Sequence, residues 1–182
     1  MSSYEKIIKT YVNSLYQVSQ EENLEKILFD QICFVQDIFN KNLDLVNILK
    51  VPTINKLEKT KIIDEIFKNK LNIYIINFIK ILINNNRISL IFKIIDKYKK
   101  LYYKKNNIKL IKIISAIDLD DLEKKDIILK SEKLFNKKII ADFIVDKKII
   151  GGVIIESDDK LYNMSVSNKL ANIKKLIVEK II

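Results

Sequence analysis

The stretch KYKKLYYKKNNIKLIKIISAI, from Lys97 to Ile117, contains the change in hydrophobic period that decides the fold. Before Asn106, apolar residues recur three and four positions apart, which is the period of an α-helix. After Asn107, the chain becomes rich in β-branched residues and is typical of a β-strand. The sequence therefore predicts an α+β protein whose two parts meet at these asparagines.

The part before this boundary, residues 1–105, is predicted to be a six-helix bundle. The connections between its apolar segments are short and often contain asparagine, and short connections favour antiparallel neighbours. Pro52, the only proline, and Thr53, a candidate N-cap, mark the break before the fourth helix. The predicted helices span residues 4–20, 23–40, 43–49, 54–69, 71–85 and 88–105.

The part after the boundary, residues 106–182, is predicted to be a small domain with a mainly antiparallel sheet and two helices. A helix with an acidic start follows the strand at 108–117. Strands are then predicted at 138–145, 149–157 and 161–163. The last helix begins near Val166, has Ser165 as its natural N-cap, and carries an apolar stripe formed by Val166, Leu170, Ile173 and Ile177.

The only two glycines of the chain, Gly151 and Gly152, are adjacent and fall inside the predicted strand at 149–157. Glycine within a strand marks a bulge or a close approach by another part of the backbone. We expect a neighbouring element to pack against this bare backbone; the alternative is a chance pair in a loop. Elsewhere the chain is expected to use asparagine for left-handed turns, since asparagine also tolerates that conformation.

The composition argues against an enzyme or a metalloprotein. Histidine is absent, which removes the usual general base and the commonest metal ligand. Cys33 is the only cysteine, so we expect a small buried side chain and no internal disulfide. No catalytic motif, cofactor or metal site is predicted. No apolar run is long enough to cross a bilayer and no secretory signal is visible, so we expect a cytoplasmic protein or one held peripherally on a membrane complex.

The net charge of +10 is concentrated in residues 51–106, which hold 13 basic and 4 acidic residues. The densest segment, residues 97–105, interleaves lysines with Tyr98, Tyr102 and Tyr103. Such a segment is compatible with RNA binding. The other interpretation is a solvated helix face whose tyrosines pack inward.

Two helices carry more apolar surface than one core-facing stripe requires. In the first helix, we assign the stripe of Ile7, Tyr11, Leu15 and Val18 to the core. A second apolar stripe lies beside it on the first helix, and three isoleucines lie among polar neighbours on the fifth helix. This additional apolar surface predicts a groove for an apolar partner helix. These candidate contacts are Ile8, Val12, Tyr16, Ile73, Ile76 and Ile83. Burial of both helices on two sides is the alternative.

The order of several segments resembles one known family. These segments are TYVNSLYQVSQEE near the start, NFIKILINNNRISLI in the middle, IISAIDL after the boundary, then VDKKIIGGVIIES and YNMSVSNKLANIKKL. Together they resemble the delta subunit of bacterial F-type ATP synthase, which is similar to the mitochondrial oligomycin-sensitivity-conferral protein. One departure is Asn163-Met164-Ser165, where the family usually has Asp-Gly-Ser before the last helix.

This resemblance implies a non-catalytic stator subunit, present in one copy, which resists rotor torque during proton-driven ATP synthesis. The helical domain would bind the N-terminal segments of alpha subunits on the alpha/beta catalytic head, in a groove framed by the first and fifth helices. The C-terminal domain would bind the ends of the peripheral-stalk b subunits. The protein would then lie peripherally on the cytoplasmic side of the bacterial inner membrane, with no nucleic-acid partner.

Overall fold

The computed structural model describes residues 3–157, 160–166 and 168. Its contacts divide the chain into two compact units between Tyr102 and Tyr103. This division falls within the last turn of helix α6 (Ile91–Lys105), close to the boundary predicted after residue 105. The two units are described separately because each has its own apolar core.

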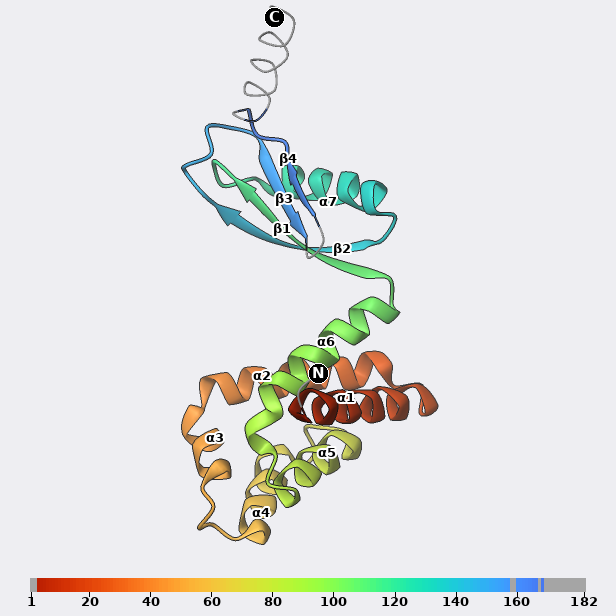
Figure 1. Cartoon of the computed structure of the whole chain (residues 1–182), viewed down its shortest axis with the longest axis vertical. Coiled ribbons are helices and arrows are strands. Elements are labelled where there is room, and N and C mark those ends of the chain that lie inside the picture. Colours follow the sequence, from red (N-terminus) through yellow and green to blue (C-terminus); the bar gives the residue numbers. More distant parts are fainter. Residues whose placement is uncertain (1–2, 158–159, 167, 169–182) are drawn as a thin grey trace, which may run out of the picture. The chain divides into compact units, whose positions relative to one another are not determined.

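The N-terminal unit is built from helices (Figure 1). Their bounds follow the predicted segments to within a few residues, but the N-cap of the fourth helix is Asn55 rather than Thr53. Asn55 accepts a hydrogen bond from the Leu57 backbone N–H at 3.1 Å and so caps α4. Within the described residues the elements are α1 (Ser3–Glu21), α2 (Glu25–Lys41), α3 (Leu43–Lys50), α4 (Lys56–Phe67), α5 (Ile73–Asn84), the short 3-10 helix η1 (Ile88–Leu90) and α6.

The core of this unit is centred on α5, the most apolar helix. Half of its twelve residues are buried, because α5 packs against α4 and also contacts α2 and η1. Aromatic side chains connect the surrounding helices. The rings of Phe39 and Phe67 meet edge to face at 6.1 Å, and those of Tyr16 and Tyr98 lie 6.2 Å apart. Burial on several sides explains why α5 needs no polar face.

Asparagine takes the left-handed positions, as predicted. Among the described residues, every non-glycine residue with positive φ is an asparagine: Asn23, Asn69, Asn86, Asn107 and Asn136. Asn86 shows the consequence for the fold. Its N–H donates to the Ile83 carbonyl and the next N–H, of Arg87, donates to the Leu82 carbonyl at 2.7 Å. This pair of bonds ends α5 as a Schellman motif and fixes the backbone of Arg87.

The C-terminal unit contains a four-stranded sheet in the order β2-β1-β3-β4 (Figure 1). Its strands are β1 (Ile108–Ser115), β2 (Lys138–Val145), β3 (Val153–Ser157) and β4 (Leu161–Asn163). β1 and β2 are parallel, while β3 is antiparallel to both β1 and β4. The sheet is therefore mixed rather than mainly antiparallel, because helix α7 (Asp121–Phe135) forms the crossover that parallel neighbours require.

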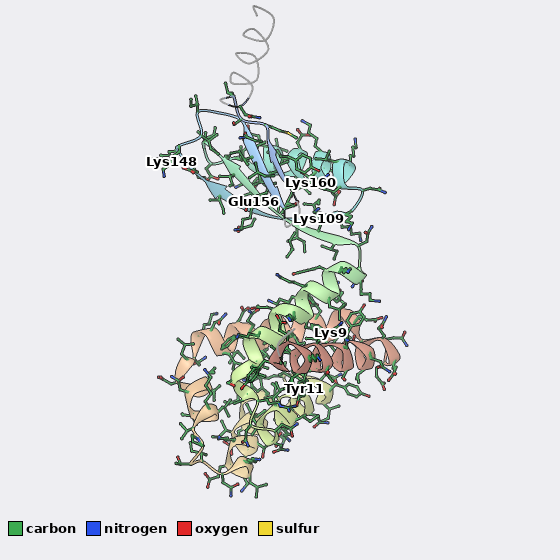
Figure 2. All side chains as sticks on the ribbon, viewed as in Figure 1. Lys9, Tyr11, Lys109, Lys148, Glu156 and Lys160 are labelled. Carbon is green, nitrogen blue, oxygen red and sulfur yellow. The ribbon has the colours of Figure 1, made fainter. Side chains whose placement is uncertain are left out.

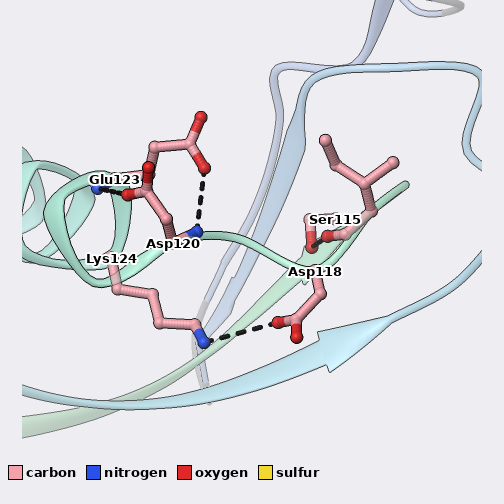
Figure 3. Close-up of polar contacts among 6 residues, drawn as sticks. Ser115, Asp118, Asp120, Glu123 and Lys124 are labelled. Atoms are coloured by element: carbon pink, nitrogen blue, oxygen red, sulfur yellow. Dashed lines mark hydrogen bonds and ion pairs between the residues drawn. The ribbon is translucent and has the colours of Figure 1, made fainter.

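Helix α7 covers one face of this sheet. Ile127, Ile128 and Phe135 pack against a buried isoleucine cluster from the strands. The helix begins with a capping box, in which the Asp120 carboxylate accepts from the Glu123 N–H at 2.7 Å and the Glu123 carboxylate accepts from the Asp120 N–H at 3.0 Å (Figure 3). Of the second predicted helix, Val166 and Asn168 are helical; Leu170, Ile173 and Ile177 lie outside the described residues.

The glycine pair lies in a bend just before β3, not inside the strand as predicted. The expected close approach is nevertheless present. The Gly151 carbonyl accepts from the Val166 N–H at 2.9 Å, and Gly152 has φ of 81°. The pair therefore packs against the start of the last helix. There Ser165 acts as the N-cap, since its hydroxyl oxygen accepts from the Asn168 N–H at 3.3 Å.

The Asn163-Met164-Ser165 turn supplies its own hydrogen bonds. The Asn163 side-chain oxygen accepts from the Ser165 N–H at 3.0 Å and from the Ser165 hydroxyl at 2.6 Å. The Asn168 side chain donates to the Asn163 carbonyl at 2.9 Å. Asn163 thus stabilises the turn through its side chain where the resembled family has an acidic residue.

Candidate partner-binding groove

A groove of about 530 Å³ lies between α1 and α5. The two helices run in opposite directions along it. Tyr11, in the first half of α1, contacts Asn85 and Arg87 beyond the end of α5. At the other end of the groove, Tyr74 at the start of α5 donates a hydrogen bond to Glu22, beyond the end of α1. This bond raises the pKa of Tyr74. The groove is lined by Ile7, Thr10, Tyr11, Ser14, Leu15, Val18, Tyr74, Asn77, Phe78, Ile81, Asn85 and Arg87.

Most of the groove is apolar. Leu15 and Phe78 are buried, while the Ile81 side chain is 48% exposed. The ring of Tyr11 meets the ring of Phe78 edge to face at 6.2 Å. The lining from Ile7 to Val18 spans twelve residues of helix, or about 17 Å. An apolar channel of this length is suited to one face of a short amphipathic helix.

One end of the groove is polar. The Tyr11 hydroxyl accepts hydrogen bonds from the Asn85 side-chain amide and from the Arg87 guanidinium, both at 3.0 Å. The guanidinium carbon also lies 5.6 Å from the centre of the Tyr11 ring, within cation–π range. Tyr11, which Figure 2 labels on α1, therefore holds Arg87 at this end of the groove.

The structure places five of the six predicted contacts in the core, so their expected exposure is wrong. Ile73 is exposed but is not among the residues that line the groove. The two apolar stripes of α1 are exchanged relative to the prediction, since Ile7, Tyr11, Leu15 and Val18 line the groove. The buried five are Ile8 (4% exposed), Val12 (4%), Tyr16 (7%), Ile76 (7%) and Ile83 (2%).

A packing detail decides between the stripes of α1. Both are apolar, so hydrophobic period alone does not distinguish them. The buried stripe continues to Ser19, which is small and whose hydroxyl donates to the Tyr16 carbonyl at 2.6 Å, and it brings Tyr16 against Tyr98. A groove does lie between the two predicted helices, but most of the residues predicted to line it are buried in the core instead.

Arg87 is one of several groove residues, with Phe78 and Ile81, that were not predicted from the sequence. It is the only arginine among the 33 basic residues of the chain. Lysine fills the other 32 positions, so a single arginine is a usable signal. A planar guanidinium can stack on an aromatic ring and present several fixed donors, which an ammonium group does not do.

Two of the three tyrosines in the basic segment at 97–105 do not present their rings for stacking on bases. Tyr98 is completely buried, and Tyr102 stacks on Phe29 with ring centres 4.0 Å apart. Lys99 donates a hydrogen bond to Gln36. RNA binding through interleaved tyrosines is therefore unsupported, and the inward-packed interpretation applies to Tyr98 and Tyr102.

Neither a metal site nor a reactive thiol is seen in the described part of the chain. No three Cys, Asp or Glu side chains gather there as metal ligands would. Cys33 is half-buried, and burial raises the pKa of its thiol, which is the opposite of activation. None of the described helices is both long and apolar enough to cross a membrane.

The sheet offers a second apolar surface, on the face opposite α7. Leu110, Ile140 and Ile144 are about two-fifths exposed there, at 41%, 45% and 39%. Between them, Asp142, Lys112 and Glu156 stand opposite one another in the strand register. No described helix covers this face, and apolar side chains in rows on such a sheet face are typical of an interaction surface.

Comparisons with known proteins agree with one another. Residues 7–177 match the family described as ATP synthase delta (OSCP) subunit. The chain is 33% identical over 177 residues to ATP synthase subunit delta of Clostridium botulinum strain Hall, covering 97% of this chain and 99% of the relative. It is 31% identical over 172 residues to ATP synthase subunit delta of Rickettsia typhi, covering 94% of each. A chain of the Toxoplasma gondii mitochondrial ATP synthase hexamer has the same fold, with a TM-score of 0.67 over 94% of this chain and 97% of that one, at 11% identity.

Proposed function

The chain belongs to the ATP synthase delta (OSCP) subunit family, and we propose that its two units hold different parts of the stator. The family is a structural subunit, so this chain is a non-catalytic stator subunit of F-type ATP synthase. It is part of that complex and has no membrane-spanning helix among its described residues. We place it on the cytoplasmic side of the bacterial inner membrane, in one copy per complex.

The N-terminal unit, residues 1–105, binds the catalytic head of alpha and beta subunits. An amphipathic N-terminal segment of one alpha subunit occupies the α1/α5 groove. The observation that carries this proposal is the groove itself, because Leu15, Phe78 and Ile81 provide an apolar channel about as long as a three-turn helix. Burial of each aliphatic group against the segment contributes roughly 1.5–3 kcal/mol.

The C-terminal unit, residues 106–182, binds the C-terminal ends of the peripheral-stalk b subunits. Support comes from the sheet face opposite α7, where Leu110, Ile140 and Ile144 expose apolar surface in the described part of the unit. Two separately anchored units let one chain connect the head to the stalk and so resist the torque of the rotor.

A calorimetric titration with a peptide tests the groove. The peptide comprises about 20 N-terminal residues of the cognate alpha subunit, which is longer than the groove. Ile81→Asp should reduce affinity at least tenfold, because it places a charge in an apolar contact. Ile48→Asp, on α3 and similarly exposed at 42%, is the matched control and should leave affinity unchanged. Equal affinity of the two variants would place the alpha contact elsewhere.

Salt dependence separates this function from RNA binding. Peptide binding through apolar contacts should change little between low and moderate salt. Binding of a nucleic acid through several lysines would weaken steeply over the same range.

A further inference from the structure

We propose that the segment bound in the α1/α5 groove carries one carboxylate that pairs with Arg87 and thereby sets the register of the segment. This inference rests on the proposed function of the groove and adds the charge and position of a specific contact. It follows from the electrostatics of the groove together with the way Arg87 is held.

Among the described residues that line the groove, Arg87 is the only charged one. Its guanidinium donates to the Tyr11 hydroxyl, and it makes no ion pair with any described residue. A guanidinium has five N–H donors and no acceptor, so one neutral hydroxyl leaves most of its donor capacity available. Lys80, on α5, differs because it pairs with Asp64 at 2.6 Å.

An apolar helix that covered the groove would remove Arg87 from water. Desolvation of a charge is strongly unfavourable unless an opposite charge and hydrogen bonds replace the solvent. A carboxylate satisfies both needs, because it matches the guanidinium fork with two parallel hydrogen bonds. The groove is therefore complementary to an amphipathic segment that is acidic at one point, and a wholly apolar or basic segment is disfavoured.

The position of Arg87 is fixed before any partner arrives. The Schellman turn at Asn86 sets its backbone, and Tyr11 sets its side chain through one hydrogen bond and one ring contact. A preformed cation loses little conformational freedom on binding, so its pairing contributes more to affinity than that of a mobile surface lysine.

The register follows from where Arg87 lies along the groove. It contacts Tyr11, while the apolar lining continues along α1 to Val18, seven residues or about 10 Å further. The acidic residue of the segment should therefore stand at one end of its apolar stripe, with apolar residues three, four and seven positions away on the same face.

A double-mutant cycle in calorimetric titrations tests the contact. The probe is the peptide of about 20 N-terminal residues of the cognate alpha subunit, together with versions in which each Glu or Asp is changed singly to its amide. One amide peptide should bind the wild-type protein about tenfold more weakly than the unchanged peptide does. The same two peptides should bind Arg87→Gln with equal affinity. Arg87→Lys should recover only part of the lost affinity, because an ammonium group lacks the bidentate geometry.

Lys80→Gln is the matched control. It removes the same unit of charge, but from α5 and at a residue that does not line the groove, so peptide affinity should not change. Thermal melts of each variant establish that the fold is retained. Should Arg87→Gln fail to fold, the cycle is closed with Arg87→Lys, where a smaller coupling to the same acidic residue is expected.

The outcomes distinguish this inference from the proposed function. If the peptide binds and Ile81→Asp weakens binding, but no acidic residue is coupled to Arg87, the groove retains its function and the carboxylate contact is wrong. If the peptide does not bind the wild-type protein at all, the proposed function of the groove fails and the inference fails with it.

Discussion

The carbonyl oxygen of Met164 lies 2.7 Å from the position that a Cβ atom on Gly152 would occupy. The Cα of Ser165 is only 3.1 Å from the same point, and Gly152 has φ of 81°. A side chain is therefore excluded by fixed backbone atoms and by the left-handed conformation. At Gly151 the nearest atom is a side-chain methyl of Val166, at 3.3 Å, which can shift.

This difference predicts unequal effects of substitution. Gly152→Ala should destabilise the C-terminal unit by about 1–3 kcal/mol, because it combines backbone strain with a clash. Gly151→Ala should cost less than about 1 kcal/mol. Urea denaturation measures both, and hydrogen exchange should locate the Gly152 effect in the C-terminal unit. Equal stability of the two variants would contradict the close approach.

The buried hydroxyl of Tyr98 should make the stability of the fold depend on pH. Its side chain is completely buried, and among the described residues its hydroxyl has no hydrogen-bond partner. Burial raises the pKa of Tyr98 to about 12, although the nearby Ser19 side chain acts in the opposite direction. In the unfolded chain the phenol ionises near its ordinary value of 10.0. The folded state thus holds the proton more tightly, and stability should fall as pH rises from about 10 to about 12.

Tyr98→Phe should remove that contribution to the pH dependence. At neutral pH it should be as stable as wild type or slightly more stable, because it eliminates a buried polar group that lacks a partner. Urea denaturation at pH 7 and at pH 10.5 tests both statements. A loss of more than about 1 kcal/mol at neutral pH would mean that the hydroxyl makes a stabilising hydrogen bond.

The sequence predicts elements well where one local rule applies. The change of period at Asn106 locates the start of β1, and asparagine at left-handed positions follows from the conformational tolerance of that residue. The parallel pairing of β1 and β2 was missed, although the intervening helix requires a crossover connection.

The buried face of a helix is harder to predict than the position of the helix in the sequence. On α1, Ile7 and Ile8 begin two equally apolar stripes, and only the tertiary contact between Tyr16 and Tyr98 selects the buried one. On α5, Ile76 and Ile83 lie near Asn77 and Lys80 in sequence, which suggested exposure. Lys80 instead pairs with Asp64 of α4 at the surface, while Ile76 and Ile83 fill the core. Long-range packing of this kind leaves no mark in the period of a single helix.

Separate cores predict that the helical unit folds by itself. The core of residues from Ile8 to Tyr98 and the core around Ile113 share no member. A fragment of residues 1–105 keeps α6 intact and should show a helical circular-dichroism spectrum with one cooperative melt. An unfolded fragment would mean that the helices depend on the C-terminal unit.

The last prediction compares two isoleucines on α5 that differ in burial. Ile83 is 2% exposed in the core, whereas Ile81 is 48% exposed at the groove. Ile83→Ala should cost about 2–5 kcal/mol of unfolding free energy, because it opens a cavity among packed side chains. Ile81→Ala removes the same atoms from a half-solvated position and should change stability by less than about 0.5 kcal/mol. Titration with the alpha-subunit peptide should show the reverse order, since Ile81→Ala removes a contact and a folded Ile83→Ala protein keeps the groove lining. A large loss of stability in Ile81→Ala would make this residue part of the core and remove it from the proposed binding surface.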